Sequence, residues 1–279
     1  MGRVVVAVDG GQASDSALDW AIELARTTPT ELQIVTVYDS VWSPYGDSAS
    51  QFRPLYESVL ERAAERISRT APQVRFTQTV RNGLAPTEIA RASREADLLV
   101  LGTHKPTRMR GAVYGTLPLR VAATTHCPTV VVPVQWTPSA GPVVVGFDAV
   151  NEQPAAIRFA REFASERHRH LVVVHAWHIP PIVAVEMLSN AALWDSMKAA
   201  HHETLSREVA AIREADPRLT VRGVLKEGPA VVALLGEGTG ASVLVVGRHG
   251  RGAVAGLLLG STSHDVLLNM PCPVVVVPE

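Results

Sequence analysis

The sequence predicts an α/β protein made of two tandem, doubly wound domains, each with a five-stranded parallel sheet flanked by helices. Three observations support this fold class: short valine-rich runs alternate with helical patterns, a block of about 140 residues occurs twice, and a proline-containing segment joins the two copies. With 279 residues, 47% of them hydrophobic, the chain is long enough for two cores of ordinary size.

The repeat extends along the chain. VVVAVD at 4–9 recurs as VVVGFD at 143–148, an offset of 139. LLVLGTH at 98–104 recurs as VLVVGRH at 243–249, an offset of 145. A period of this length indicates domain duplication rather than a solenoid.

The expected strands of each copy are short and valine-rich, and most of them are nearly continuous in apolarity, as expected for parallel strands covered by helices on both faces. We expect strands at 3–9, 31–38, 74–81, 97–102 and 128–133, and again at 142–148, 170–177, 218–226, 242–247 and 273–278. Helical patterns predict helices near 12–27, 52–71, 84–95 and 115–125, and near 152–168, 189–215, 229–237 and 260–270. This alternation predicts a parallel sheet in each copy.

Pro133 to Pro142 forms the predicted linker, so that one domain occupies 1–134 and the other 142–279. The eight residues between the two prolines span at most about 28 Å when extended. The two copies must therefore be neighbours.

Charge and composition exclude several classes of partner. Lys and Arg total 26 and Asp and Glu total 27, a formal charge of −1, so no basic surplus is available for nucleic acid. No apolar run approaches the roughly 18 residues of a membrane span. Only five apolar residues follow Arg3 before Asp9, too few for a signal peptide. We expect a cytoplasmic protein without a membrane partner, in which Cys127 and Cys272 stay reduced.

The stretch at 243–263 has the features of an anion site. An apolar run breaks at Gly247, a glycine-rich loop follows, and a helical pattern starts at Gly260. Gly247 and Gly250 can adopt positive φ and allow close approach of the backbone to a ligand. The first amides of a helix are unpaired donors at the positive end of its dipole. These features predict a phosphate site, whereas the simpler interpretation is that Ser261 only caps a helix.

Other motifs are weaker. The Walker A pattern is absent, and the G-x-G-x-x-A at 250–255 follows the fourth strand of its copy, whereas a dinucleotide fingerprint follows the first. Four histidines lie near the second strand of the second copy: His168, His170, His175 and His178. Neighbouring side chains along a strand point to opposite faces, and no carboxylate completes a metal-ligand set. A metal site is therefore not expected at these histidines.

The pattern that is present is G-x-x-G, nine residues, then G-[ST], formed by Gly247, Gly250, Gly260 and Ser261. Together with VVVGFD, LVVVHAW and CPVVVVP in the same copy, it resembles the universal stress protein family in its tandem form, and specifically the ATP-binding branch. The resemblance implies a strand order of 3-2-1-4-5 and ATP, with or without Mg²⁺, at the carboxyl ends of the strands. Open α/β sheets bind ligands at that edge.

The resemblance also implies roles for residues of the second copy. Asp148 would contact the nucleoside, the backbone of Ala176 would read the adenine, and Val246 and Gly247 would lie along the ribose. The phosphates would contact His249, Gly250, Gly260, Ser261, Thr262 and Ser263.

The first copy keeps only part of this set. Its matching residues are Asp9, Val37, Gly102, Gly115 and Thr116. Lys105 replaces the second glycine, and Leu117-Pro118 removes two hydroxyls and one backbone donor. Because an ammonium can hold a phosphate as a point charge, we expect a weakened or altered site that includes Lys105.

In a sheet of order 3-2-1-4-5 the fifth strand lies at an edge. A bare valine-rich edge would present unpaired N–H and C=O groups to other chains. We therefore expect TVVVP at 129–133 and VVVVP at 274–278 to pair antiparallel about a pseudo-twofold axis. One chain is then the equivalent of a dimer, and any homo-oligomer must use another surface.

The expected function is that of an ATP-binding universal stress protein, a regulatory module whose conformation or choice of protein partner depends on the nucleotide. One alternative is a slow ATP hydrolase, although no base for an attacking water is evident and no catalytic residue is predicted. Another is an assembly module with a vestigial nucleotide pocket.

Overall fold

The computed structural model describes residues 2–38, 49–104, 116–149, 154–179, 191–248 and 259–279. The strands of the first half are β1 (Arg3–Ala7), β2 (Glu31–Tyr38), β3 (Phe76–Asn82), β4 (Leu98–Thr103) and β5 (Thr129–Pro133). Those of the second half are β6 (Val143–Gly146), β7 (Leu171–Trp177), β8 (Val221–Glu227), β9 (Val243–Gly247) and β10 (Val274–Val277).

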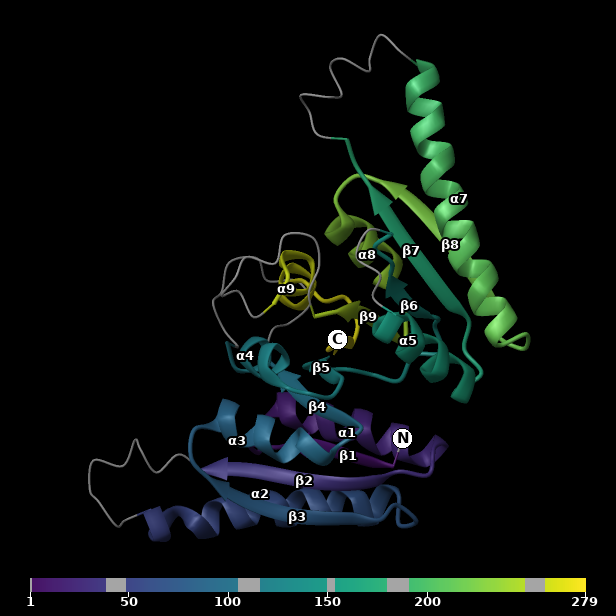
Figure 1. Ribbon diagram of the computed structural model, residues 1–279. Helices are drawn as coiled ribbons and strands as arrows, with labels where there is room; N and C mark the ends of the chain where they lie inside the picture. The colour runs from purple at the N-terminus through teal and green to yellow at the C-terminus, as the bar shows by residue number, and fades with distance from the viewer. Residues whose placement is uncertain (1, 39–48, 105–115, 150–153, 180–190, 249–258) are drawn as a thin grey trace.

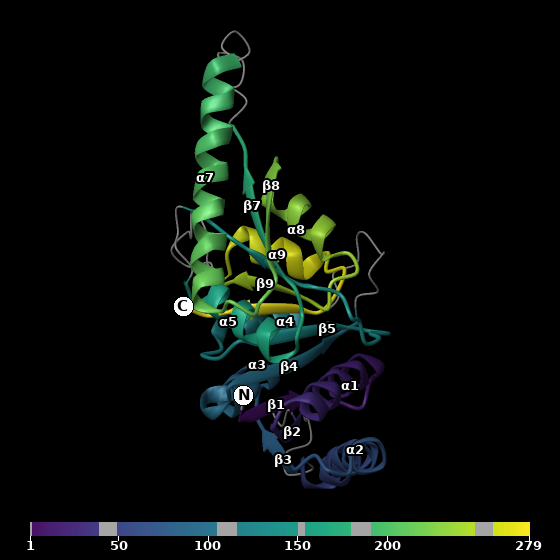
Figure 2. The same cartoon turned by 90° about the vertical axis from the view of Figure 1, so that its right-hand side faces the viewer.

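These strands form one continuous sheet in the order β3-β2-β1-β4-β5-β10-β9-β6-β7-β8. Each half has the predicted order 3-2-1-4-5 and is parallel throughout. The two edges meet at β5 and β10, which pair antiparallel with Val274 opposite Val131 and Val276 opposite Thr129. The predicted pseudo-twofold arrangement is confirmed. The sheet twists along its length, so that β7 and β8 are steeply inclined to β2 and β3 (Figures 1 and 2).

Helices cover both faces of the sheet. One face carries α1 (Gln12–Thr27), α2 (Ala49–Thr70), α5 (Pro154–Glu166) and α7 (Ala191–Ala215). The other carries α3 (Ala85–Ala92), continued by the 3₁₀ turn η3 (Ser93–Glu95), and then α4 (Thr116–Thr124), α8 (Ala230–Gly238) and α9 (Ser261–Leu268). None of the helices in the described ranges is both long and apolar enough to cross a membrane.

The valine-rich strands place side chains alternately into the two layers. Val4 and Val6 pack toward α1 and α2, whereas Val5 packs toward α3, and all three are fully buried. On the first of these faces the core is continuous across both halves. Trp20 of α1 stacks on Phe163 of α5, with ring centroids 6.2 Å apart and 10° between the ring planes. The halves are therefore joined by packing as well as by the sheet.

The linker lies against both halves. Val134 N donates a hydrogen bond to Thr103 O at 3.1 Å, and Ser139 Oγ donates to Gly240 O at 3.1 Å. Trp136 packs on the shared core. The boundaries expected at residues 134 and 142 stay a prediction.

A candidate nucleotide site in the second half

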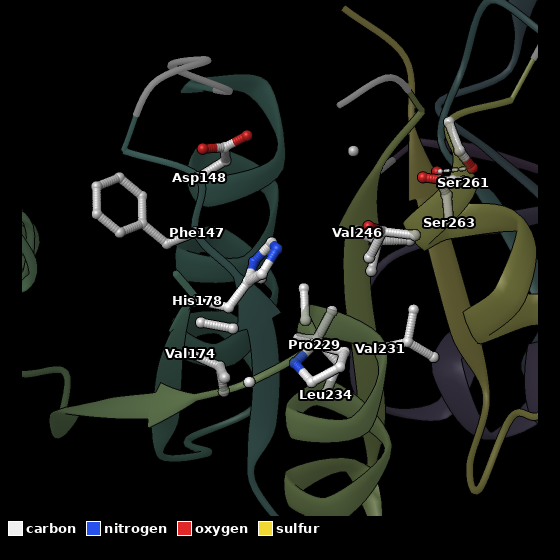
Figure 3. A pocket seen from close by; sticks show the side chains of 17 residues that line it. Phe147, Asp148, Val174, His178, Pro229, Val231, Leu234, Val246, Ser261 and Ser263 are labelled. Carbon is white, nitrogen blue, oxygen red and sulfur yellow. Dashed lines mark hydrogen bonds between the residues drawn. The ribbon is translucent and has the colours of Figure 1, made fainter. Parts of the chain in front are cut away.

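A cavity of about 350 Å³ lies at the carboxyl ends of β6, β7 and β9, between these strands and the helices α8 and α9 (Figure 3). It is lined by Gly146, Phe147 and Asp148 after β6, by Val174, Ala176 and His178 of β7 and its end, by Val246 and Gly247 of β9, by Gly228, Pro229, Ala230, Val231 and Leu234 around the start of α8, and by Gly260, Ser261, Thr262 and Ser263 at the start of α9.

The structure thus brings eight of the predicted residues of the second copy to one cavity. They are Asp148, Ala176, Val246, Gly247, Gly260, Ser261, Thr262 and Ser263. His249 and Gly250 lie outside the described residues. The individual contacts of these residues with ATP stay a prediction.

The start of α9 forms a polar end of the cavity. The first hydrogen bond within the helix runs from His264 N to Gly260 O at 2.9 Å, so the amides of the three preceding residues lack a partner within the helix. Gly260 is the N-cap, with φ −65° and ψ 152°, and it has no side chain to cover those amides. This end of the cavity combines backbone donors with the positive end of a helix dipole, which suits an anion.

The three hydroxyls of α9 have different environments. Ser263 is buried, and its Oγ donates to Arg248 O at 3.1 Å and to Gly260 O at 3.2 Å. Gly260 N donates to the same Arg248 carbonyl at 2.8 Å. Ser261 is exposed and Thr262 is half-buried. Ser263 therefore holds the start of the helix in place, and Ser261 and Thr262 are better placed to meet a ligand.

The opposite end of the cavity is mainly apolar. Val174 and Leu234 form its walls, whereas the ring of Phe147 points away from the cavity (Figure 3) and packs on His175, with ring centroids 5.5 Å apart. Gly228 adopts φ +116°, and a Cβ on it would have no neighbour within 4 Å, so the turn between β8 and α8 leaves space beside the cavity. No motif in the sequence marks this wall. The expected sheet could have predicted it, because the end of the third parallel strand lies at the same edge as the ends of the first and second.

His178 and Asp148 supply side-chain polarity at the mouth of the cavity. Figure 3 shows the imidazole of His178 projecting from the end of β7 toward the cavity, with Asp148 at the rim. Asp148 stands two residues beyond the end of β6 rather than within the strand as expected. His178 was considered only as a metal ligand, and its place at the cavity was not foreseen.

The expectation for the conformation of Gly247 was wrong. Positive φ was expected there, but Gly247 is the last residue of β9 and lies opposite Val277 of β10, in extended conformation. The physical reason is that the ladder continues past the glycine, since Arg248 N still donates to Val277 O at 2.8 Å.

In the first half, two of the matching residues have structural roles. Asp9 Oδ1 accepts the amide of Gly11 at 2.8 Å, which closes the turn into α1. A Cβ on Gly102 would lie 2.0 Å from Ala13 O, so glycine is required there by the close approach of α1 to β4.

The remaining expected contacts of the first half are less informative. Val37 is half-buried near the end of β2 and packs against the core under α3. Lys105 and Gly115 lie outside the described residues, and only the backbone of Thr116, the first residue of α4, is described.

The histidines of the second half do not share one location. His175 is fully buried; its Nδ1 lies 3.0 Å from Phe147 O and its Nε2 lies 2.9 Å from Nδ1 of His201 on α7. Because a carbonyl only accepts, His175 carries its proton on Nδ1 when neutral, and His201 then donates to Nε2. This chain ties α7 to the residue beside Asp148. Within the described ranges, no group of three His, Cys, Asp or Glu side chains is arranged to hold a metal ion.

The chain matches the model of the universal stress protein family twice, at residues 1–133 and 140–278. A universal stress protein of Mycobacterium tuberculosis is 29% identical over 297 residues, which cover 98% of this chain and 94% of that protein. The crystal structure of a universal stress protein from Archaeoglobus fulgidus superposes with a TM-score of 0.75 at 17% identity, covering 99% of this chain and 98% of the other. A putative universal stress protein from Pseudomonas aeruginosa gives a TM-score of 0.66 at 19% identity, covering 99% and 92%.

Proposed function

This chain belongs to the universal stress protein family, in two tandem copies, and from that premise we propose that it binds ATP in its second half and acts as a nucleotide-dependent regulatory module. The observation that carries the proposal is the division of the cavity into two chemically different ends. A nucleoside triphosphate has the same division, with an apolar, stackable base at one end and a polyanion at the other.

The two ends of the cavity match these two parts of the ligand. Val174, Val231 and Leu234 offer apolar contact area for the base, and the amides at the start of α9 offer donors for phosphate. Asp148 lines the cavity, and we expect its carboxylate to accept hydrogen bonds from ribose hydroxyls. Ligand pockets of this kind combine mainly apolar walls with a few fixed polar groups.

Mg²⁺ would reach this site with the nucleotide. Asp148 is the carboxylate that lines the cavity among the described residues. Mg²⁺ keeps several waters and is usually held by phosphate oxygens and one or two carboxylates. The residues present fit a Mg²⁺ ion carried by the phosphates, with Asp148 as the carboxylate that would hold the ion or its waters.

A regulatory role is supported by the contacts that join the cavity to helix α7. Phe147 O is joined through His175 and His201 to α7, and Trp177 also stacks on His201 with ring centroids 5.0 Å apart. A ligand that shifts the segment at Phe147 would shift this chain of rings and with it α7. The helix extends beyond the sheet (Figures 1 and 2), where a protein partner could contact it.

A cytoplasmic location is part of the proposal, because ATP is abundant there and thiols stay reduced. Cys127 and Cys272 are both free and buried, which suits a reducing compartment.

Isothermal titration calorimetry with the full chain tests the proposal. We expect ATP to bind in the presence of Mg²⁺, and AMP to bind more weakly because it reaches fewer amides of α9. Mass spectrometry of small molecules released by denaturing the purified protein provides a second readout. A chain that neither retains nor binds ATP would support the assembly-module alternative, and steady release of ADP would support the hydrolase.

A further inference from the structure

Arg248 connects the polar end of the cavity to the other half of the chain. Its carbonyl is the common acceptor for Gly260 N and Ser263 Oγ, at 2.8 and 3.1 Å, so it fixes the start of α9. Its side chain crosses to the first half, where Nη1 donates to Thr125 O at 2.9 Å. One residue therefore contacts α9 through its backbone and the end of α4 through its guanidinium.

The acceptor in the first half is firmly placed. Thr125 directly follows α4, and its carbonyl lies at the negative end of that helix dipole, where a cation is favoured. Thr125 N donates to Val121 O at 3.0 Å, and Thr125 Oγ1 lies 2.8 Å from Thr129 Oγ1. Because Thr129 pairs with Val276 across the junction of the two halves, Arg248 is attached close to that junction.

The guanidinium of Arg248 is also costly to bury. Its Nε is buried without a hydrogen-bond partner in the part of the chain that the structure describes. An unpaired buried donor lowers stability, and the Thr125 bond offsets part of that cost. A small shift of either helix changes the length of that bond and therefore its energy.

The first copy has no arginine at the position equivalent to Arg248. The repeat places Thr103 at the equivalent position of the first half. Thr103 lies within β4, and its carbonyl accepts Val134 N from the linker at 3.1 Å. Its side chain is far shorter than that of arginine and is buried locally.

We propose that Arg248 is a positioning residue that couples nucleotide binding in the second half to helix α4 of the first half. The coupling rests on the proposed function. Phosphate bound to the amides of α9 acts on Gly260 and Ser263, and both of these residues donate hydrogen bonds to the Arg248 carbonyl. In return, α4 holds Arg248 and keeps the start of α9 in the binding conformation, which reduces the ordering cost of binding. The coupling is reciprocal by thermodynamic necessity.

The test uses the full chain with Arg248→Met, which keeps a long apolar side chain and removes the guanidinium. We expect ATP affinity to fall roughly fivefold to tenfold, within the usual range of coupling between sites. The ATP affinity of Arg248→Lys should lie between those of the wild type and Arg248→Met, because the ammonium keeps a charge and a donor. Hydrogen exchange gives the specific readout: ATP should slow amide exchange in the last turn of α4 in the wild type, and this response should be lost in Arg248→Met.

Arg213→Met is the matched control. It also removes a half-buried bond from a guanidinium to a carbonyl, that of Arg213 Nη2 to Val221 O at 2.6 Å, but at the amino end of β8, opposite the cavity edge. It should reduce thermal stability to a similar degree and leave ATP affinity and the α4 response unchanged.

The outcomes separate the two proposals. No ATP binding by the wild type overturns the proposed function and the coupling together. Wild-type binding with unchanged affinity and an unchanged α4 response in Arg248→Met overturns the coupling alone. Equal weakening in Arg248→Met and Arg213→Met also overturns it, because the effect would then be a general loss of stability.

Discussion

Gly260 occupies the N-cap of α9, where a side chain would stand between the helix amides and a bound phosphate. Gly260→Asp should leave the fold intact, since Asp is a favourable N-cap. Its carboxylate would use the same amides and repel the phosphates, so we expect ATP affinity to fall by about tenfold or more. Calorimetric titration with thermal melts followed by circular dichroism measures both effects.

The matched control is Gly260→Asn, which has the same size and capping ability without the charge. It should weaken ATP binding less than Gly260→Asp does. An unchanged affinity in Gly260→Asp would place the phosphates elsewhere.

The two cysteines give a second prediction at the residue scale. Burial raises the pKa of the Cys127 thiol to about 11 and that of Cys272 to about 12. The thiolate is the reactive form, so both should react slowly with a disulfide reagent at pH 7.5 in the native state and rapidly in denaturant. Because the pKa is higher in the folded than in the unfolded state, these groups favour folding below pH 9 and this contribution is lost as the pH rises further. Rapid modification of the native protein would show that the thiols are accessible.

Single-residue roles were the least predictable part of the site. The sequence grouped Ser261, Thr262 and Ser263 as equivalent, yet the hydroxyl of Ser263 is used within the protein. Which hydroxyl turns inward depends on the residue at which the helix begins, and a one-residue difference rotates it by about 100°. Gly102 similarly matched a ligand-binding pattern but is explained by its contact with Ala13.

At the scale of elements, the sequence predicted every strand and helix described, mostly within about three residues. Buried parallel strands are short apolar runs with glycine or proline nearby, and the repeat shows each of them twice. The differences lie at strand ends. β1 and β6 end at Ala7 and Gly146, two residues before the predicted ends, because the chain then turns toward the following helix. The cavity wall at the start of α8 was missed because no motif marks it, although the predicted strand order places the end of β8 at the same edge of the sheet.

The junction of β5 and β10 gives a prediction at this scale. Val276 is 1% exposed and lies opposite Thr129. Val276→Lys would bury an unpaired charge between the halves, and we expect the free energy of unfolding to fall by about 3 kcal/mol or more. Denaturant titration measures the loss, and crosslinking between the halves reports whether they separate.

Val232→Lys is the control, because the same change is made at a side chain that is 66% exposed. It should have little effect on stability. If Val276→Lys were equally mild, the edges would not be held together by this pairing in solution.

At the scale of the whole molecule, the pairing of β5 with β10 leaves β3 and β8 as the outer edges of the sheet. Both carry polar or charged residues along their length, FTQTVRN and VRGVLKE. Charged side chains on edge strands oppose pairing with another chain. The chain thus contains its own dimer interface, and this feature could be predicted because two valine-rich edges and a short linker leave few other arrangements.

The two halves should nevertheless bind ATP unequally. Ser263 and Pro118 occupy equivalent positions at the starts of α9 and α4, and both are buried. Ser263 provides a backbone N–H and a hydroxyl that holds the Arg248 carbonyl, whereas Pro118 provides neither. The first half therefore begins α4 with one amide fewer and with no equivalent anchor.

We expect wild-type calorimetry to show one tight ATP site per chain, and Gly260→Asp to leave at most a weak one. In that background, adding Lys105→Gly, Leu117→Thr and Pro118→Ser restores the glycine, the two hydroxyls and the missing amide to the first half. This variant should bind ATP more tightly than Gly260→Asp alone. Two equal sites in the wild type would contradict the asymmetry. A restored motif that gains no affinity would instead show that the turn from Asp9 into α1, or another part of the first half, limits binding, and not the departures in sequence at residues 105, 117 and 118.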